Sequence, residues 1–206
     1  MYVSADKIKE ALDVFRKHGN VLRTKEVQTL GVHKRTLYKM HHEGLITKLE
    51  RGVYSLSDGV SLSNPDLAII ASKIPSARIC LISALALHNM TNEIPHKIHI
   101  ALSRSQRNPR LAYPPVQIYR FSGESLTEGV EITSINGVKV QVYNPAKTIA
   151  DCFKFRNQIG KEIAIEALNR GIRERRVTYK EILHYSRICR VERVIKPYLE
   201  SVTSEQ

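Results

Sequence analysis

Two glycines, Gly31 and Gly44, limit what the first sixty residues can fold into. Gly31 separates two short segments of helical periodicity, Lys25–Leu30 and His33–His42, and Gly44 ends the second of them. Glycine is favoured at such points because it has no Cβ and allows the chain to turn tightly. A longer amphipathic segment, Ala5–Lys17, precedes them. Two short helices joined at a glycine have the layout of a helix-turn-helix, so the sequence predicts this motif.

The predicted helix His33–His42 has two unlike faces. When it is projected at about 100° per residue, one arc carries cationic side chains and an aromatic ring, from Lys34, Arg35, Tyr38, Lys39 and His42. The opposite side carries Leu37, Met40 and His33, with Thr36 at the margin. Arg and Lys can bind guanine edges or phosphates, and Tyr can contact phosphates or bases. The alternative is an ordinary solvated helix face. The DNA contacts predicted from this helix are Lys34, Arg35, Thr36, Tyr38 and Lys39.

A β-hairpin is predicted directly after this helix. Residues Leu45–Leu56 consist of two β-prone stretches on either side of a turn at Gly52. A hairpin in this position is a wing, whose tip lies along the DNA backbone or the minor groove. Lys48 and Arg51, with Tyr54 as a further candidate, are the predicted contacts of the wing. Residues 1–60 are therefore predicted to form a winged helix-turn-helix domain that binds double-stranded DNA.

The charge of the whole chain agrees with a polyanionic partner. Its 206 residues carry 32 Lys and Arg against 20 Asp and Glu, a net charge of +12, and the isoelectric point is near 9.7. No apolar run approaches the roughly 18–20 residues that span a bilayer. Cys80, Cys152 and Cys189 are widely spaced among apolar neighbours, which indicates buried free thiols. We therefore expect a cytoplasmic protein that does not bind a membrane.

Residues 61–206 are predicted to form a second domain. Strands are expected at Lys97–Leu102, Val116–Phe121, Gly129–Ile135 and Val138–Tyr143, and Asn136-Gly137 is a strong hairpin signal between the last two. Helices are expected at 65–73 and 83–89 and, after Pro145, at Ala146–Phe155, Ile159–Gly171, Tyr179–Tyr185 and Cys189–Ser201. The predicted fold class is α+β, with a small antiparallel sheet and C-terminal helices following the winged helix-turn-helix.

Two further clusters of positive charge lie in this second domain. The first cluster is on a Pro-rich loop after residue 103 and contains Arg104, Arg107 and Arg110. The second follows a predicted helix and contains Arg173, Arg175 and Arg176. Both are candidate secondary contacts to nucleic acid or to an acidic partner protein. The alternative for both is a solvated surface.

The sequence has no catalytic pattern. It contains no (D/E)-x-K triplet, which a PD-(D/E)xK nuclease needs, and no paired carboxylates at D-x-D or D-x-E spacing to hold a metal pair. It also has no phosphate-binding loop and no histidine pattern of a metal site. Asp151, the one acid in an apolar helix, is expected to form a salt bridge or stabilise the helix start. We therefore predict no catalytic residues, no metal and no cofactor, and a protein that is not an enzyme.

Several motifs, in their order along the chain, resemble the AbiEi family of abortive-infection antitoxins. These are Arg51–Tyr54, Ile82–His88, Ile98–Ile100, Tyr143–Asp151 and Ala164–Leu168. The family often has arginine where this chain has Lys147. The resemblance implies the antitoxin of a type IV toxin–antitoxin system, with an N-terminal winged helix and a C-terminal antitoxin domain. It further implies a nucleotidyltransferase-like toxin, AbiEii, and repression of the chain's own promoter at inverted repeats. Repressors usually place two copies on such repeats, so we expect a monomer in solution or a dimer on DNA.

Two other functions remain open on the sequence. The chain could be a winged-helix transcription regulator whose second domain binds a ligand or a protein, with no toxin. It could also be a nucleic-acid-processing enzyme that uses the winged helix for delivery. A neighbouring gene for a nucleotidyltransferase-like protein favours the antitoxin over the first of these alternatives.

Overall fold

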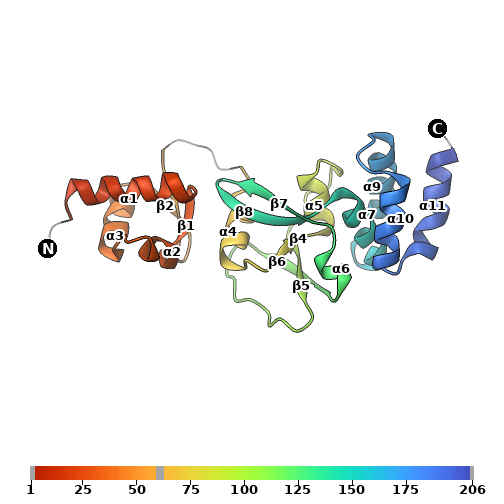
Figure 1. Ribbon diagram of the computed structural model, residues 1–206, viewed down its shortest axis with the longest axis horizontal. Helices are drawn as coiled ribbons and strands as arrows, with labels where there is room; N and C mark the ends of the chain where they lie inside the picture. Colours follow the sequence, from red (N-terminus) through yellow and green to blue (C-terminus); the bar gives the residue numbers. More distant parts are fainter. Residues whose placement is uncertain (1–2, 59–62, 205–206) are drawn as a thin grey trace. The chain divides into compact units, whose positions relative to one another are not determined.

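The computed structural model describes residues 3–58 and 63–204, which form two compact units (Figure 1). The N-terminal unit runs to Pro75 and includes Leu111–Pro114 and Thr133–Val140. The remaining residues, from Ser76 onward, form the C-terminal unit. The predicted domain boundary between residues 60 and 61 lies outside the described residues. The N-terminal unit continues beyond that boundary, because a helix and two later segments of chain pack with its first residues.

Four helices and three strands of the N-terminal unit lie between residues 3 and 75 of the described chain. They are α1 (Ala5–His18), β1 (Val21–Arg23), α2 (Thr24–Thr29), α3 (Lys34–His42), β2 (Ile46–Glu50), β3 (Val53–Leu56) and α4 (Pro65–Lys73). The strands form an antiparallel sheet in the order β1-β3-β2. The three predicted helices and the hairpin are confirmed. Strand β1 was not predicted, since three residues are too few to show a period of two.

The apolar faces of helices α1, α2 and α3 pack together in one hydrophobic core. Phe15 of α1, Val27 of α2, and Leu37 and Met40 of α3 are at most 1% exposed and belong to the same cluster of buried side chains. The start of α1 is capped by Ser4, whose hydroxyl accepts a hydrogen bond from the Lys7 amide at 3.4 Å. This packing fixes which side of α3 faces inward.

A second, smaller cluster joins the sheet to α4. Val21 of β1, Val53 of β3 and Ala68 of α4 are buried together, with Val138 packed against them. Val138 adjoins the turn Asn136-Gly137, whose two residues both have positive φ, as a two-residue hairpin turn requires. A Cβ added at Gly137 would lie 2.6 Å from the Gly19 Cα, so this close approach of two backbones requires glycine.

The C-terminal unit combines strands with a larger set of helices. In chain order its elements are β4 (Arg78–Ile79), α5 (Leu81–Leu87), β5 (Ile98–Ser103), β6 (Val116–Phe121), α6 (Glu124–Thr127), β7 (Val130–Ile135), β8 (Val138–Tyr143), α7 (Pro145–Lys154), α8 (Arg156–Ile159), α9 (Lys161–Arg173), α10 (Tyr179–Ile188) and α11 (Glu192–Ser204). Strand β7 ends and strand β8 begins within the segment Thr133–Val140, which belongs to the N-terminal unit. The described chain is thus of the α+β class, as predicted.

The second sheet corrects the prediction that it would be antiparallel. Its order is β6-β5-β4-β8-β7, and only some neighbours are antiparallel. Strand β4 pairs antiparallel with β5, whereas β5 with β6 and β4 with β8 are parallel pairs. The sheet is therefore mixed. The alternation of apolar and polar residues along a strand does not reveal whether its neighbour runs parallel or antiparallel. The Asn-Gly signal predicted an antiparallel hairpin for β7 and β8 only.

Helix α7 forms the centre of the C-terminal core. Every residue from Ala146 to Phe153 is buried, and the helix packs against α5, α9 and α10. Figure 1 shows α9, α10 and α11 gathered around it. Cys80, Cys152 and Cys189 are buried free thiols, as predicted. Among the described residues, no helix combines the length and the apolar character needed to cross a membrane.

Candidate nucleic-acid interface

Helix α3 begins with a side-chain cap. His33 has extended backbone angles, and its Nδ1 accepts a hydrogen bond from the Arg35 amide at 3.1 Å. This bond satisfies one of the amides that have no partner inside a helix. The sequence analysis placed His33 on the packed side of the helix. That placement is wrong, because His33 precedes the first helical residue and is exposed.

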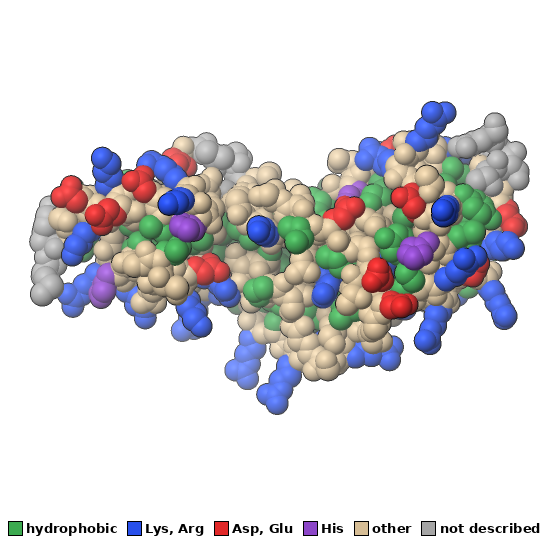
Figure 2. Space-filling model, viewed as in Figure 1, with side chains coloured by type: hydrophobic (Ala, Val, Ile, Leu, Met, Phe, Trp, Pro, Cys, Tyr) green, Lys and Arg blue, Asp and Glu red, His purple; other side chains and the backbone are tan. Residues whose placement is uncertain are grey.

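The outward face of α3 carries positive charge without acidic residues. Lys34 and Arg35 are exposed, and Tyr38 is 57% exposed. Within residues 3–58 and 63–204, neither cationic side chain has a hydrogen bond or an ion pair. In Figure 2 the acidic side chains of the N-terminal unit lie mainly along its upper edge. Lys and Arg side chains lie along both edges, including the lower edge, where Figure 1 places α2 and α3. This face can attract phosphate groups.

Two of the predicted contacts from α3 are placed differently. Thr36 is only 4% exposed and lies on the same side as Leu37 and Met40, so it packs inside the unit and is withdrawn as a DNA contact. Lys39 is half-buried: its Nζ donates to the Val3 carbonyl at 3.0 Å and lies 3.6 Å from Glu43 Oε1. The ammonium of Lys39 is thus partly engaged within the protein and contributes less charge to the surface than Lys34 and Arg35.

The hairpin predicted after helix α3 is present and consists of β2 and β3. Its turn contains Gly52, with φ of 76°, and Arg51 beside it is exposed, as is Lys48 on β2. Tyr54 is a correction, because it is 5% exposed, its ring centroid is 5.8 Å from that of His41, and burial raises the pKa of its phenol. Tyr54 belongs to the buried cluster that includes side chains of α1 and α3, so it projects from the face of the sheet that the helices cover.

The residues that hold the wing turn in place were not found from the sequence. Lys73, the last residue of α4, places its Nζ 2.6 Å from Glu50 Oε2 and donates a hydrogen bond to the Arg51 carbonyl. Thr24, the first residue of α2, donates its amide to the Gly52 carbonyl at 2.9 Å. No local pattern relates Lys73 to a turn more than twenty positions earlier, because their proximity arises from tertiary packing.

The arginine-rich loop between β5 and β6 is exposed but tied at its base. Arg104, Arg107 and Arg110 are exposed, as a solvent-facing cationic loop requires. The guanidinium of Arg120 donates to the Ser103 and Gln106 carbonyls at 2.7 and 2.8 Å and also binds Asn108. One arginine side chain therefore orders the first part of the loop.

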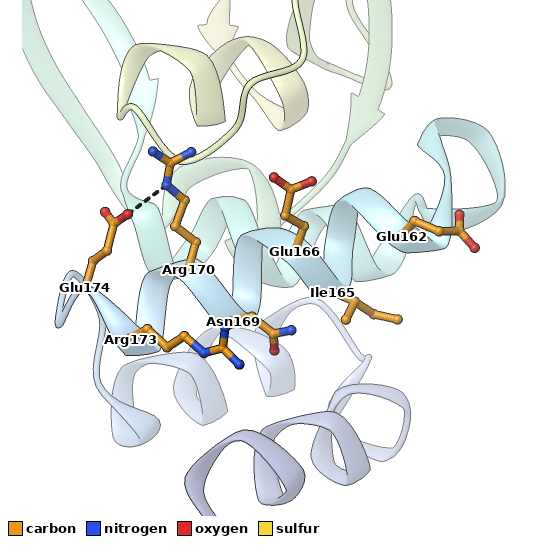
Figure 3. Close-up of a pocket in the computed structure, with 7 residues that line it drawn as sticks. All are labelled: Glu162, Ile165, Glu166, Asn169, Arg170, Arg173 and Glu174. Atoms are coloured by element: carbon orange, nitrogen blue, oxygen red, sulfur yellow. Dashed lines mark hydrogen bonds and ion pairs between the residues drawn. The ribbon is translucent and has the colours of Figure 1, made fainter. Parts of the chain in front are cut away.

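In the cluster of Arg173, Arg175 and Arg176, the Arg176 side chain forms bonds within the C-terminal unit. Arg176 Nε lies 2.6 Å from Glu174 Oε2, and Arg176 Nη1 donates to the His88 carbonyl at 3.0 Å. Glu174 also binds Arg170, as Figure 3 shows, and these hydrogen bonds lower the pKa of its carboxyl. Arg175 is exposed and has φ of 55°, in the turn after α9. Arg176 is therefore used internally and is a weaker candidate for a nucleic-acid contact than Arg175.

A shallow cavity of about 660 Å³ follows the exposed face of α9 (Figure 3). Its lining is of mixed charge and consists of Glu162, Ile165, Glu166, Asn169, Arg170, Arg173 and Glu174. Three carboxylates in one lining do not favour a phosphate. Among the described residues, no three His, Cys, Asp or Glu side chains gather closely enough to hold a metal ion.

The exposed cations of α3 and of the β2–β3 turn define a candidate nucleic-acid-binding surface. Residues 9–57, which run from α1 to β3, match the model of a family described as a transcriptional regulator, the AbiEi antitoxin. This match confirms the resemblance predicted from the sequence and locates it in the N-terminal region.

A crystal structure is among the solved structures that share the fold over most of the chain. It is the crystal structure of the RV2827C protein from Mycobacterium tuberculosis, with a TM-score of 0.60 and 11% sequence identity. The similarity covers 90% of this chain and 72% of the other. At this identity the likeness concerns the fold alone. No curated relative matches the chain.

Proposed function

We propose that this chain is a DNA-binding repressor of its own promoter and the antitoxin of a type IV toxin–antitoxin system. In this proposal it counteracts a nucleotidyltransferase-like toxin, AbiEii, and acts by binding rather than by catalysis. The observation that carries the proposal is the match of residues 9–57 to the antitoxin regulator family, over the same segment that presents the exposed cations of α3.

In the proposed complex the N-terminal unit acts as a winged helix-turn-helix. Helix α3 enters the major groove, where Arg35 and Lys34 reach guanine edges or phosphates and Tyr38 contacts a phosphate or a base. The β2–β3 hairpin is the wing, and Arg51 and Lys48 bind the adjacent backbone. Two copies would occupy an inverted repeat, because the two half-sites repeat the same contacts. Exposed arginines of the β5–β6 loop add attraction that is independent of sequence.

A mobility-shift assay on the chain's own promoter region tests the DNA-binding part. The variant Lys34→Ala with Arg35→Ala removes the two exposed cations of α3. A matched control, Lys7→Ala with Lys9→Ala, removes the same charge from the exposed side of α1. We expect only the first variant to lose retention of the promoter, and to lose about two units of the slope of log K against log salt. Equal affinities of the two variants would refute the assignment of α3.

The antitoxin part needs a separate test. The neighbouring nucleotidyltransferase-like gene would be expressed together with the full-length chain, either wild type or Lys34→Ala with Arg35→Ala. We expect both to restore growth, because the proposal assigns neutralisation to the C-terminal unit. A fragment that starts at residue 61 is unsuitable, since α4 and two later segments belong to the N-terminal unit. Failure of the wild-type chain to restore growth would refute the antitoxin function.

One observation favours a second candidate, a transcription regulator with a ligand-binding C-terminal unit. A cavity of about 510 Å³ lies between residues 93–97, β5, β6 and α8, and His99 and Tyr119 are among its lining residues. His99 is 9% exposed, and its Nδ1 has no hydrogen-bond partner within the described residues. Growth rescue by the chain in the co-expression test would favour the antitoxin over this candidate.

A further inference from the structure

The turn of the β2–β3 hairpin is held from two sides. On one side, the Thr24 amide of α2 donates to the Gly52 carbonyl at 2.9 Å. On the other, Lys73 Nζ donates to the Arg51 carbonyl. The two bonds end on consecutive carbonyl groups of the turn, so they restrain the Arg51–Gly52 and Gly52–Val53 peptide groups. The side chain of Arg51 remains exposed.

Lys73 also compensates the negative charge of Glu50, which would otherwise compete with DNA phosphates for Arg51. Glu50 is adjacent to Arg51, its side chain is only 12% exposed, and its Oε2 lies 2.6 Å from Lys73 Nζ. Without the Lys73 ammonium, the largely buried Glu50 carboxylate would have no counter-charge. The nearest exposed cation along the chain would then be the Arg51 guanidinium. A carboxylate that captures Arg51 would withdraw it from phosphate and would itself repel the DNA backbone.

We infer that Lys73 is a positioning residue for the wing, which keeps the Arg51 guanidinium available for a DNA phosphate. The inference rests on the proposed function, because it assumes that the wing binds DNA. Lys73 acts through Arg51 and does not itself touch the DNA. Helix α4 is therefore part of the DNA-binding module, although the family match ends at residue 57 and α4 begins at Pro65.

A double-mutant cycle tests this role in the full-length chain. The dissociation constant for the promoter fragment would be measured for wild type, Arg51→Ala, Lys73→Met and the double variant. Each single change is expected to weaken binding by about tenfold, the effect of losing one charge-assisted contact. Because both changes remove the same contact, the double variant should bind as weakly as Arg51→Ala alone. Wild-type affinity in Lys73→Met, or additive losses in the double variant, would overturn the inference.

Two further variants separate positioning from net charge and from folding. Glu50→Gln with Lys73→Met keeps the net charge of the wild type and leaves no uncompensated carboxylate, but it lacks the bond to the Arg51 carbonyl. We expect its affinity to lie between those of Lys73→Met and the wild type, because the charge of Glu50 is removed but the bond to the Arg51 carbonyl is still missing. An affinity as low as that of Lys73→Met would overturn the compensation of Glu50 by Lys73. Lys73→Arg should retain most of the affinity, because it can still pair with Glu50 and reach the carbonyl. Thermal unfolding of each variant shows whether the fold is kept.

The outcomes also separate this inference from the proposed function. If the wild-type chain does not bind the promoter fragment at all, the proposed function fails. If the wild type binds and Arg51→Ala weakens binding, but Lys73→Met does not, the proposed function stands and only the role of Lys73 is refuted.

Discussion

The Lys147 ammonium and the Asp151 carboxylate form an ion pair in which neither side chain has any exposed surface. Lys147 Nζ lies 2.5 Å from Asp151 Oδ2, one turn apart on α7. The other carboxylate oxygen accepts a hydrogen bond from Cys189 Sγ at 3.2 Å, and Lys147 Nζ lies 4.0 Å from the centroid of the Tyr143 ring. Each charge is thus compensated from more than one direction, as burial in a core of low dielectric constant requires.

Removal of one partner of this pair should destabilise the protein strongly. In Lys147→Met the Asp151 carboxyl loses its counter-charge, and burial, which already raises its pKa, then acts without that compensation. We expect the free energy of unfolding in urea to fall by about 3–5 kcal/mol. The control is Lys196→Met, which removes an exposed i,i+4 partner of Glu200 and should cost no more than about 1 kcal/mol. Equal losses in both variants would contradict a compensating role of Lys147.

The sequence motif around this pair shows how much of the fold is encoded locally. The Asn144 side chain accepts from the Lys147 amide at 2.8 Å, and Pro145 occupies the first turn of α7, as their residue types predict for a helix start. The expectation that Asp151 forms a salt bridge is confirmed. Helix caps, glycine turns and the Asn-Gly hairpin involve residues within a few positions of one another, so a local sequence pattern is enough to predict them.

The features that sequence reasoning missed depend on contacts between distant residues. A helical projection places Thr36 at a margin, and only the packing of α3 against α1, α2 and β2 decides that this margin is buried. Strand alternation in the hairpin cannot show which face of β3 the helices cover, and Tyr54 lies in one buried cluster with residues of α1 and α3. The parallel pairing of β5 with β6 likewise depends on how a long loop returns.

Substitutions that conserve shape at these two buried positions should leave DNA binding unchanged. Tyr54→Phe removes a hydroxyl that the sequence analysis assigned to the wing, and Thr36→Val removes one assigned to α3. Because both side chains are at most 5% exposed, we expect promoter affinity within about twofold of wild type. Arg35→Ala provides the positive control in the same mobility-shift assay. A tenfold or greater loss in either conservative variant, with thermal unfolding unchanged, would restore that residue as a DNA contact.

Arg120 should protect the loop between β5 and β6 from proteolysis. Its guanidinium bonds to Ser103, Gln106 and Asn108, so Arg120→Ala releases the first part of the loop. We expect trypsin to cleave this variant faster after Arg104 and Arg107, with cleavage sites identified by mass spectrometry. Arg120→Lys should not restore protection fully, because an ammonium lacks the planar fork that serves three acceptors. Cleavage at the wild-type rate in Arg120→Ala would show that other contacts order the loop.

The burial of His99 should make the stability of the protein depend on pH. Burial lowers the pKa of His99 from 6.5 to about 4, whereas the unfolded chain binds the proton near pH 6.5. Between these values the unfolded state takes up a proton that the folded state does not, so the free energy of unfolding falls as the pH is lowered from about 6.5 to about 4. The loss from this residue reaches at most about 3 kcal/mol near pH 4, because a tenfold change in proton affinity corresponds to about 1.4 kcal/mol.

Comparison with two glutamine variants isolates this contribution from the carboxyl groups that titrate in the same range. Urea unfolding of wild type, His99→Gln and His96→Gln would be followed between about pH 4 and pH 7, the range in which an unperturbed histidine changes its charge. His96 is an exposed neighbour, so His96→Gln should retain the wild-type pH dependence. His99→Gln replaces the titrating ring, and its stability should fall less steeply than that of the wild type as the pH decreases, whatever its stability at neutral pH. If the two glutamine variants show the same pH dependence as the wild type, His99 does not remain neutral in the folded protein.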